Sequence, residues 1–378
     1  MDIFVKGVGR TKFGAFATSL RTLLVECADR TIEDAGIPKK DIDAIFVSNF
    51  VGGVQNRQLH LGPVTATAIG LEGVPALRIE AACASGGAAF WNAVHSRAWK
   101  KNALVIGVEH LWGSQDALTT TRSISLAGDA ELDIPEAIFP AQYALIADAY
   151  MTEHGSELTR NALDRISLKN HANANENPLA HFYGKKVTLE TIQKSDYVST
   201  PLRLFDCSPI SNGAAAVILS REKDENNVEV KSTVLTTDAT SLTQRRQITS
   251  FQAVKNAAAQ AFKQAELGTQ DIGVCEVHDC FTIAELIALE DLGFCPRGAA
   301  SEFVLEGNTE LHGKLPVNTD GGLKADGHPI GASGLGQIVE VVHQLRRTAG
   351  KRQVPCDYGL THNVGGVGGT AVISIFGA

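Results

Sequence analysis

The 378-residue chain lacks the features of two large classes of protein. Its longest apolar runs, such as residues 103–108, have the length of a strand, and none reaches the roughly 18 residues of a membrane-spanning helix. It has no basic block, and 34 Lys and Arg against 42 Asp and Glu give a net charge of −8. Binding to phosphates needs a basic face. The sequence therefore predicts neither a membrane span nor a nucleic-acid partner.

Paired cysteines and targeting signals are also missing. Seven cysteines without a C-x-x-C pair predict a reducing compartment rather than a disulfide framework. The N-terminal MDIFVKGVGR carries charge and glycine where a signal peptide has its apolar run, and the final FGA is no peroxisomal signal. With 44% hydrophobic and 20% charged residues, the chain is predicted to be a soluble cytoplasmic α/β protein with a large core.

A faint internal repeat indicates a duplicated fold. Residues 28–50 and 258–281 share the order helix, turn, acidic start and apolar strand, 230 residues apart. Each copy is followed by a strand, a turn of small residues and an apolar helix, at 78–96 and 318–345. We pair the apolar strands at 103–108 and 371–376 as the next shared element. This order predicts two similar α/β halves, each a βαβαβαββ unit.

The region between the halves breaks this rhythm. Residues 113–200 are polar, with helical Asn/Ala-rich stretches at 161–177 and an extended segment at 187–201. We interpret 113–200 as an inserted loop or lid domain that rests on the first half. The halves are then 1–112 with 201–225, and 226–378.

Cys83 is the first candidate for chemistry. It lies in RIEAACASGGAAFWNAVHS, between a short strand and a buried apolar helix. A thiol at a helix N-terminus is favoured as the thiolate by the macrodipole and the free N–H groups. The alternative is an inert buried cysteine.

Two further segments carry titratable groups. His328 is held between Gly327 and Pro329 at the matching strand-to-helix turn of the second half, where a buried core histidine is the alternative. In VCEVHDCF, His278, Asp279 and Cys280 end a strand before a helix that we expect to be amphipathic. No second ligand pair stands at zinc spacing, so we predict no metal site. Asp279 is interpreted as a cap of the following helix, and Cys280 as a proton donor and acceptor.

The glycine-rich YGLTHNVGGVGGTAVISIF near the C-terminus precedes a β-branched strand rather than a helix. It therefore does not fit a phosphate-binding loop. Its backbone N–H groups are better suited to face a reacting carbonyl oxygen.

Together these segments resemble the thiolase family, in particular its sterol-carrier-protein branch. ACASGG, HDCF, GGLKADGHPIGASG and HNVGG stand in the order that the family has, and the resemblance covers nearly the whole chain. FDCSPISNGAAAVILS is similar to another family segment, with Asn212 in place of its usual Asp. The resemblance implies a five-layer α-β-α-β-α sandwich with the insertion described above.

The resemblance also implies a role for each motif residue. Cys83 matches the acylated nucleophile and His328 the base that activates it. The last loop has Asn363 where many thiolases have a catalytic cysteine, so the acid/base cysteine is implied to be Cys280. His278 matches the first oxyanion hole, and the N–H of Gly365, with that of Cys83, the second.

The implied function is that of an acyl-CoA C-acyltransferase, a thiolase, which uses CoA as co-substrate and needs no permanently bound cofactor. The resemblance further implies a homodimer and a small OB-fold partner with a zinc ribbon. A ketosynthase-type acyltransferase and a non-catalytic binding subunit are the alternatives. The motifs specify neither the acyl group nor the direction of the reaction.

Overall fold

The computed structural model describes residues 3–133 and 137–378 and has an α/β fold built on one large sheet. Within the described residues this sheet has nine strands, in the order β3-β2-β4-β7-β1-β8-β11-β10-β9. The first half contributes β1 (Phe4–Arg10), α1 (Leu20–Ala35), β2 (Ala44–Ser48), α2 (Gly52–Gln55), α3 (Leu61–Ala68), β3 (Ala76–Ile79), α4 (Ser85–His95), β4 (Asn102–Glu109) and β7 (Gly213–Ser220).

The second half repeats the strand arrangement of the first. It contributes β8 (Val228–Thr237), α9 (Gln252–Ala265), β9 (Val274–Glu276), α10 (Thr282–Asp291), α11 (Ala300–Leu305), α12 (Gly322–Ala325), α13 (Ile330–Leu345), β10 (Tyr358–Gly365) and β11 (Thr370–Gly377). In the first half β2 and β4 are parallel, and β4 pairs antiparallel with β7, which pairs antiparallel with β1. In the second half β9 and β10 are parallel, and β10 pairs antiparallel with β11, which pairs antiparallel with β8. In the second half a parallel bridge between Cys275 and Val317 takes the position that the β2–β3 pair has in the first half. The fold class predicted from the sequence is therefore confirmed.

The strand equivalence drawn from the sequence needs one correction. The strand that occupies the place of β4 in the second half is β10, whereas β11 occupies the place of β7. The sequence analysis had paired 103–108 with 371–376, because both are short apolar runs near the ends of their halves. Because the insertion separates β7 in sequence from the other strands of the first half, the repeat did not reveal β7 as the fifth strand of that half.

Local sequence accounts for the repeated helices. In α1 the buried residues recur every three to four positions, as at Leu24, Ala28 and Ile32, so one face meets the sheet. The Ser19 side chain accepts a hydrogen bond from Thr22 N, and Gly36 ends the helix at φ 61. Because a left-handed φ favours glycine, this position sets the end of the helix.

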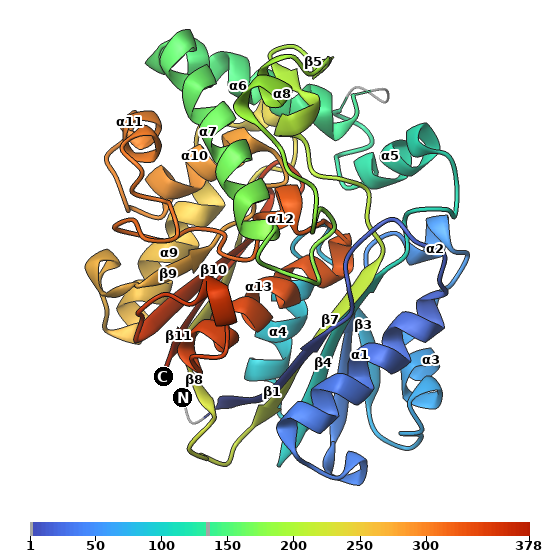
Figure 1. Ribbon diagram of the computed structural model, residues 1–378. Helices are drawn as coiled ribbons and strands as arrows, with labels where there is room; N and C mark the ends of the chain where they lie inside the picture. Colours follow the sequence, from blue (N-terminus) through green and yellow to red (C-terminus); the bar gives the residue numbers. More distant parts are fainter. Residues whose placement is uncertain (1–2, 134–136) are drawn as a thin grey trace.

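Helices form three layers around the two halves of the sheet (Figure 1). Helices α1 and α3 cover the outer face of the first half, and α9, with α10 packed beside it, covers that of the second. The central layer is α4 and α13, which pack against each other and against strands of both halves. A Cβ on Gly86 would lie 3.0 Å from the backbone N of Gly334, so glycines let the two central helices approach closely.

The segment between β4 and β7 forms helices above the sheet, drawn in green in Figure 1. It contains α5 (Ala117–Ser125), α6 (Phe139–His154), α7 (Ser156–Ala174), α8 (Leu189–Gln193), β5 (Tyr197–Ser199) and β6 (Leu202–Arg203). We expected an extended segment at 187–201, but α8 occupies part of it, with Thr188 as its N-cap.

The insertion rests mainly on the second half, whereas the sequence predicted that it rests on the first; its helix α5 does contact α2 of the first half, where Gln55 donates to Thr120. Helix α7 packs on α10, α11 and α12, and α6 also contacts α10. Apolar residues of α6 and α7, such as Tyr150 and Ile166, share one core with Ile287 of α10. Helix α10 is buried along its whole length rather than amphipathic, because the insertion covers the side that would otherwise face solvent.

Among the described residues, no helix is long and apolar enough to cross a membrane. All seven cysteines are free thiols.

Candidate active site

The candidate residues of both halves meet at one place. Cys83 follows β3, His278 and Cys280 follow β9, and His328 directly precedes α13. The Cys83 sulfur, one ring nitrogen of His278 and one ring nitrogen of His328 lie within 4.8 Å of one another. The N-termini of the two central helices, α4 and α13, therefore bring the nucleophile candidate of one half to the base candidate of the other.

Cys83 is buried, with 6% of its surface exposed, two residues before α4 begins. Its neighbour Ala82 has φ 50, a left-handed conformation that is rare for a residue with a side chain. Burial raises the pKa of the Cys83 thiol to about 12, although the backbone N–H groups of Gly366 and of Cys83 itself face the sulfur and lower it. The sequence analysis predicted a thiolate favoured by the helix N-terminus. In the structure desolvation outweighs those donors, and the resting form is the thiol.

The ring of His328 is oriented by Ser333. The Ser333 hydroxyl donates to the carbonyl of Pro329, so its oxygen accepts a hydrogen bond of 2.7 Å from His328 Nδ1–H. This leaves Nε2 with its lone pair. Burial lowers the pKa of His328 to about 3, so the ring is neutral and can accept a proton.

The ring of His278 is oriented the opposite way by Asn363. Asn363 Oδ1 accepts from Gly87 N–H at 2.9 Å, and its Nδ2 donates to the carbonyl of Cys83 at 3.0 Å. The same amide group lies 3.2 Å from His278 Nδ1, which must therefore accept. His278 carries its proton on Nε2, an atom that is buried and has no hydrogen-bond partner among residues 3–133 and 137–378. Burial keeps the pKa of the ring well below its usual range.

These ring orientations decide between two uses of the cluster. By distance, Cys83, His278 and His328 could hold a metal ion. A metal ligand needs a nitrogen lone pair, which His328 Nε2 offers but His278 Nε2–H does not. An N–H that is fixed, neutral and unpartnered instead suits an oxygen on which negative charge develops.

Cys280 lines the same cavity, 5% exposed, and burial raises the pKa of its thiol well above the usual range. The hydroxyl of Tyr143, which lines the same cavity, acts against burial and lowers the pKa of that thiol. Asp279 does not cap α10, as we had expected, but accepts from the N–H of Leu323 and fixes the start of α12. The reason is that the chain turns at Asp279 and directs its carboxylate away from α10 towards the loop before His328.

In the final glycine loop, the N–H that faces the sulfur of Cys83 belongs to Gly366, the residue after the predicted Gly365. Gly365, the predicted donor, ends β10 opposite Thr370, and a Cβ there would lie 2.6 Å from the carbonyl of Ala81. Gly366 follows at φ 61 and directs its N–H towards the sulfur of Cys83. Gly365 thus allows the loop to lie close to the 81–84 turn, and Gly366 faces the sulfur.

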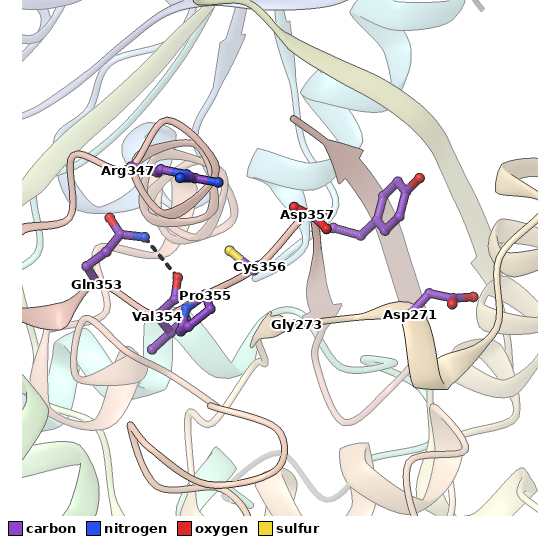
Figure 2. Close-up of a pocket in the computed structure, with 9 residues that line it drawn as sticks. Asp271, Gly273, Arg347, Gln353, Val354, Pro355, Cys356 and Asp357 are labelled. Carbon is purple, nitrogen blue, oxygen red and sulfur yellow. Dashed lines mark hydrogen bonds between the residues drawn. The ribbon is translucent and has the colours of Figure 1, made fainter.

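The cavity around these groups has a volume of about 110 Å³. Beside Cys83, Cys280, His328 and Gly366 it is lined mostly by apolar side chains, among them Leu111, Ile124, Phe139, Phe281 and Ile330. A wider depression of about 650 Å³ lies at the opposite ends of β9 and β10 and is lined by Asp271, Arg347, Cys356 and Asp357, among others (Figure 2). No histidine lines it, so the chemistry of the motifs is concentrated in the smaller cavity.

The chain matches two family models that together cover nearly all of it. Residues 3–223 match "Thiolase, N-terminal domain" and residues 235–378 match "Thiolase C-terminal domain-like". The chain belongs to the thiolase family. As a thiolase it is an acyltransferase enzyme. The boundary between the two models falls close to the charged turn that joins β7 to β8.

Its relatives include acetyl-CoA acetyltransferases and sterol carrier proteins. It is 44% identical to an acetyl-CoA acetyltransferase of Methanothermobacter thermautotrophicus over 99% of both chains. It is 31% identical to sterol carrier protein 2 of Gallus gallus, over 99% of this chain and 71% of that one. Among solved structures, an Ltp2-ChsH2(DUF35) aldolase matches with a TM-score of 0.80 and 25% identity, over 100% of this chain and 97% of that one.

Several residues of this thiolase site were not identified from the sequence. Ser333 follows His328 by five residues at the start of α13, so helix spacing could have indicated it. Tyr143 belongs to an apolar helix of the insertion, and no local pattern distinguishes it from a core residue. Asn212, which replaces the family Asp, donates to the carbonyls of Phe16 and Trp112, contacts that a carboxylate could not make.

Proposed function

We propose that this thiolase joins two acyl-CoA units, or cleaves a 3-oxoacyl-CoA with CoA, through an acyl intermediate on Cys83. The observation that supports this most directly is that reactive atoms of Cys83, His278 and His328 lie within 4.8 Å of one another, beside a cavity that Cys83, His328 and Cys280 line. Acyl transfer with carbon–carbon cleavage needs a sulfur nucleophile, a base, a proton donor at carbon and donors for two oxyanions. This chain offers a candidate for each.

In the cleavage direction, His328 Nε2 takes the proton of Cys83 as the sulfur attacks the 3-oxo carbonyl. The oxygen of that carbonyl gains negative charge and is stabilised by the N–H groups of Cys83 and Gly366. The carbon–carbon bond breaks, and the thioester enolate that leaves is stabilised by His278 Nε2–H. Cys280 protonates its α-carbon. CoA then takes the acyl group from Cys83, and no resident cofactor takes part.

The cavity supports a short acyl group. Its volume of about 110 Å³ and the ring of Phe281 beside Cys280 leave little room beyond a few carbon atoms. The 44% identical relative is named as an acetyl-CoA acetyltransferase. We therefore propose acetyl-CoA and acetoacetyl-CoA as the substrates.

The test follows the enolate absorbance of acetoacetyl-CoA with and without CoA, together with the intact mass of the protein after incubation with acetyl-CoA. We expect loss of absorbance only with CoA and one acetyl adduct per chain. Adduct formation without CoA-dependent cleavage would indicate a ketosynthase-type enzyme. No adduct and no cleavage would indicate a binding subunit, and cleavage that needs neither CoA nor an adduct would indicate an aldolase.

Two partners are proposed. Strand β3 is the edge of the sheet and exposes 41% of Leu77, so pairing with a second copy would cover it. The aldolase structure names a DUF35 chain as its partner, which supports a small OB-fold partner here. An active species of 40.2 kDa in light scattering would argue against the dimer, and purification from the host without a small zinc protein would argue against the second partner.

A further inference from the structure

Tyr143 is the one tyrosine that lines the reactive cavity, as far as the described residues show. It lies in α6, in the insertion, and is 1% exposed. Its ring stacks on Phe281, with centroids 4.5 Å apart and planes at 24°. Phe281 follows Cys280 directly. The stacking therefore fixes the phenol beside the residue that we propose as the acid/base.

The hydroxyl of Tyr143 has two neighbours in different parts of the site. It donates to the carbonyl of Gly366 at 3.1 Å, and it lies in the same cavity as the side chain of Cys280, where it lowers the pKa of that thiol. A phenol has one proton, so while it donates to Gly366 its oxygen can only accept from the S–H of Cys280. A thiolate has no proton to give. If Cys280 becomes a thiolate, the hydroxyl is free to turn and donate to the sulfur.

We propose that Tyr143 is a positioning residue for Cys280, whose hydroxyl proton alternates between the carbonyl of Gly366 and the Cys280 sulfur during each turnover. This inference rests on the proposed function, because it requires Cys280 to gain and lose a proton.

In cleavage, the S–H bond of Cys280 breaks as a C–H bond forms at the α-carbon of the enolate, and the sulfur keeps the electron pair. The Tyr143 hydroxyl rotates and donates to the thiolate, and the phenol stays protonated. The thiol of incoming CoA then returns a proton towards Cys280, and the hydroxyl turns back to Gly366. Such a charge-assisted bond is stronger than the neutral bond that it replaces.

The same hydroxyl links Cys280 to the nucleophile. The N–H of Gly366 faces the sulfur of Cys83, and the carbonyl of Gly366 is the resting partner of Tyr143. Tyr143 therefore holds the loop of the second oxyanion hole while Cys280 is a thiol. The insertion, which carries none of the family motifs that we identified, supplies this contact.

The experiment compares Tyr143→Phe with Tyr150→Phe. Tyr150 is a matched control because it lies on the same helix, is equally buried, and donates to Glu290 instead. The readouts are the acetyl adduct on Cys83 by intact mass, and the exchange of acetyl-CoA methyl protons in deuterated buffer by NMR as a function of pH. Exchange reports the proton transfer alone, without condensation.

For Tyr143→Phe we expect the acetyl adduct on Cys83 still to reach one per chain, formed more slowly because the Gly366 loop loses a contact, and exchange that is slower by about 10- to 100-fold at neutral pH, the factor of one lost hydrogen bond to a charged group. The alkaline rise of exchange should move to higher pH by about one to two units, since the thiolate loses its donor. Tyr150→Phe should lower the melting temperature and leave the exchange profile in place. Exchange within about twofold of the parent, or an unshifted profile, overturns the inference.

A second variant keeps the test valid if Tyr143→Phe does not fold. Replacing Tyr143 by 3-fluorotyrosine retains the hydroxyl and makes it a stronger donor, so the profile should move to lower pH, and an unmoved profile overturns the inference. Cys280→Ala separates the two proposals. If Cys280→Ala still exchanges, Cys280 is not the acid/base and that part of the proposed function fails. If Cys280→Ala loses exchange but Tyr143→Phe keeps it, the role of Cys280 stands and only that of Tyr143 is wrong.

Discussion

The loop after β2 and the loop after β9 hold equivalent positions in the two halves, yet they have different uses. Ser48 and Asn49 stand 230 residues before His278 and Asp279. The Ser48 hydroxyl donates to the carbonyl of Gly331, and Asn49 donates to Glu109 and accepts from Gly52 N–H. In this loop the buried polar side chains are satisfied by the protein itself.

The loop after β9 leaves one of its polar atoms unpartnered. Asp279 keeps a capping role similar to that of Asn49, but His278 Nε2–H has no acceptor and Cys280 opens into the cavity. An unpartnered buried donor costs free energy, and it is tolerated where a ligand atom takes its place. Duplication supplied two similar frameworks, and in the mechanism that we propose the first carries the nucleophile and the second the groups for proton transfer and oxyanion binding.

The largest effect on activity is expected from substitution of Cys83, the residue that the first half contributes to the proposed chemistry. Cys83→Ser should give no acyl adduct, because a hydroxyl at this buried position ionises far less readily than a thiol. Intact mass after incubation with acetyl-CoA should show one adduct on the parent and none on the variant. An adduct of the same size on the variant would move the nucleophile to Cys280 or another thiol.

Cys280→Ala tests the proton-transfer side of the comparison. Cys83 and His328 remain, so the adduct should still form. Carbon–carbon cleavage and α-proton exchange should fall by about 10² to 10⁴, as for a lost general acid/base. Near-normal exchange would return Cys280 to the role of a small core residue and direct attention to His278 or His362, whose Nδ1 accepts from the backbone N–H of His278.

The equivalent positions can be compared directly. His278→Ala removes the unpartnered donor and should slow condensation by about 10² to 10³. Ser48→Ala, its counterpart, should change the rate little and lower the free energy of unfolding by about 1 kcal/mol, the value of one buried hydrogen bond. Steady-state kinetics and urea unfolding of both variants provide the measurement. A similar loss of rate in both would mean that the halves are not divided in this way.

The smallest effect concerns the resting protonation states. With the pKa of Cys83 at about 12 and that of His328 at about 3, both groups are neutral near pH 7. Below its pKa a thiol gains about tenfold in thiolate for each pH unit, so alkylation of Cys83 by iodoacetamide should rise about tenfold per unit between pH 7 and pH 9. Peptide mass spectrometry gives the rate. A plateau near pH 7 would instead reveal a thiolate–imidazolium pair.

The sequence was sufficient for the features that local pattern and repeated order carry. Helix and strand periodicity, the 230-residue repeat and the four motifs, three of them rich in glycine, predicted the α/β duplicated fold, and the same motifs selected Cys83, His278, Cys280 and His328. These residues lie close together because each stands at the end of a strand or near the start of a central helix, and the sheet brings those ends together.

Tertiary contacts determined the protonation states of the thiol and the histidines and the orientation of the histidine rings, because these properties depend on residues far away in the sequence. Asn363 and Ser333 determine which nitrogen of each histidine carries the proton, and desolvation, which no local sequence states, keeps the Cys83 thiol neutral. The placing of the insertion on the second half brings Tyr143 to Cys280. These are the properties that convert four recognisable motifs into a site with a defined distribution of protons.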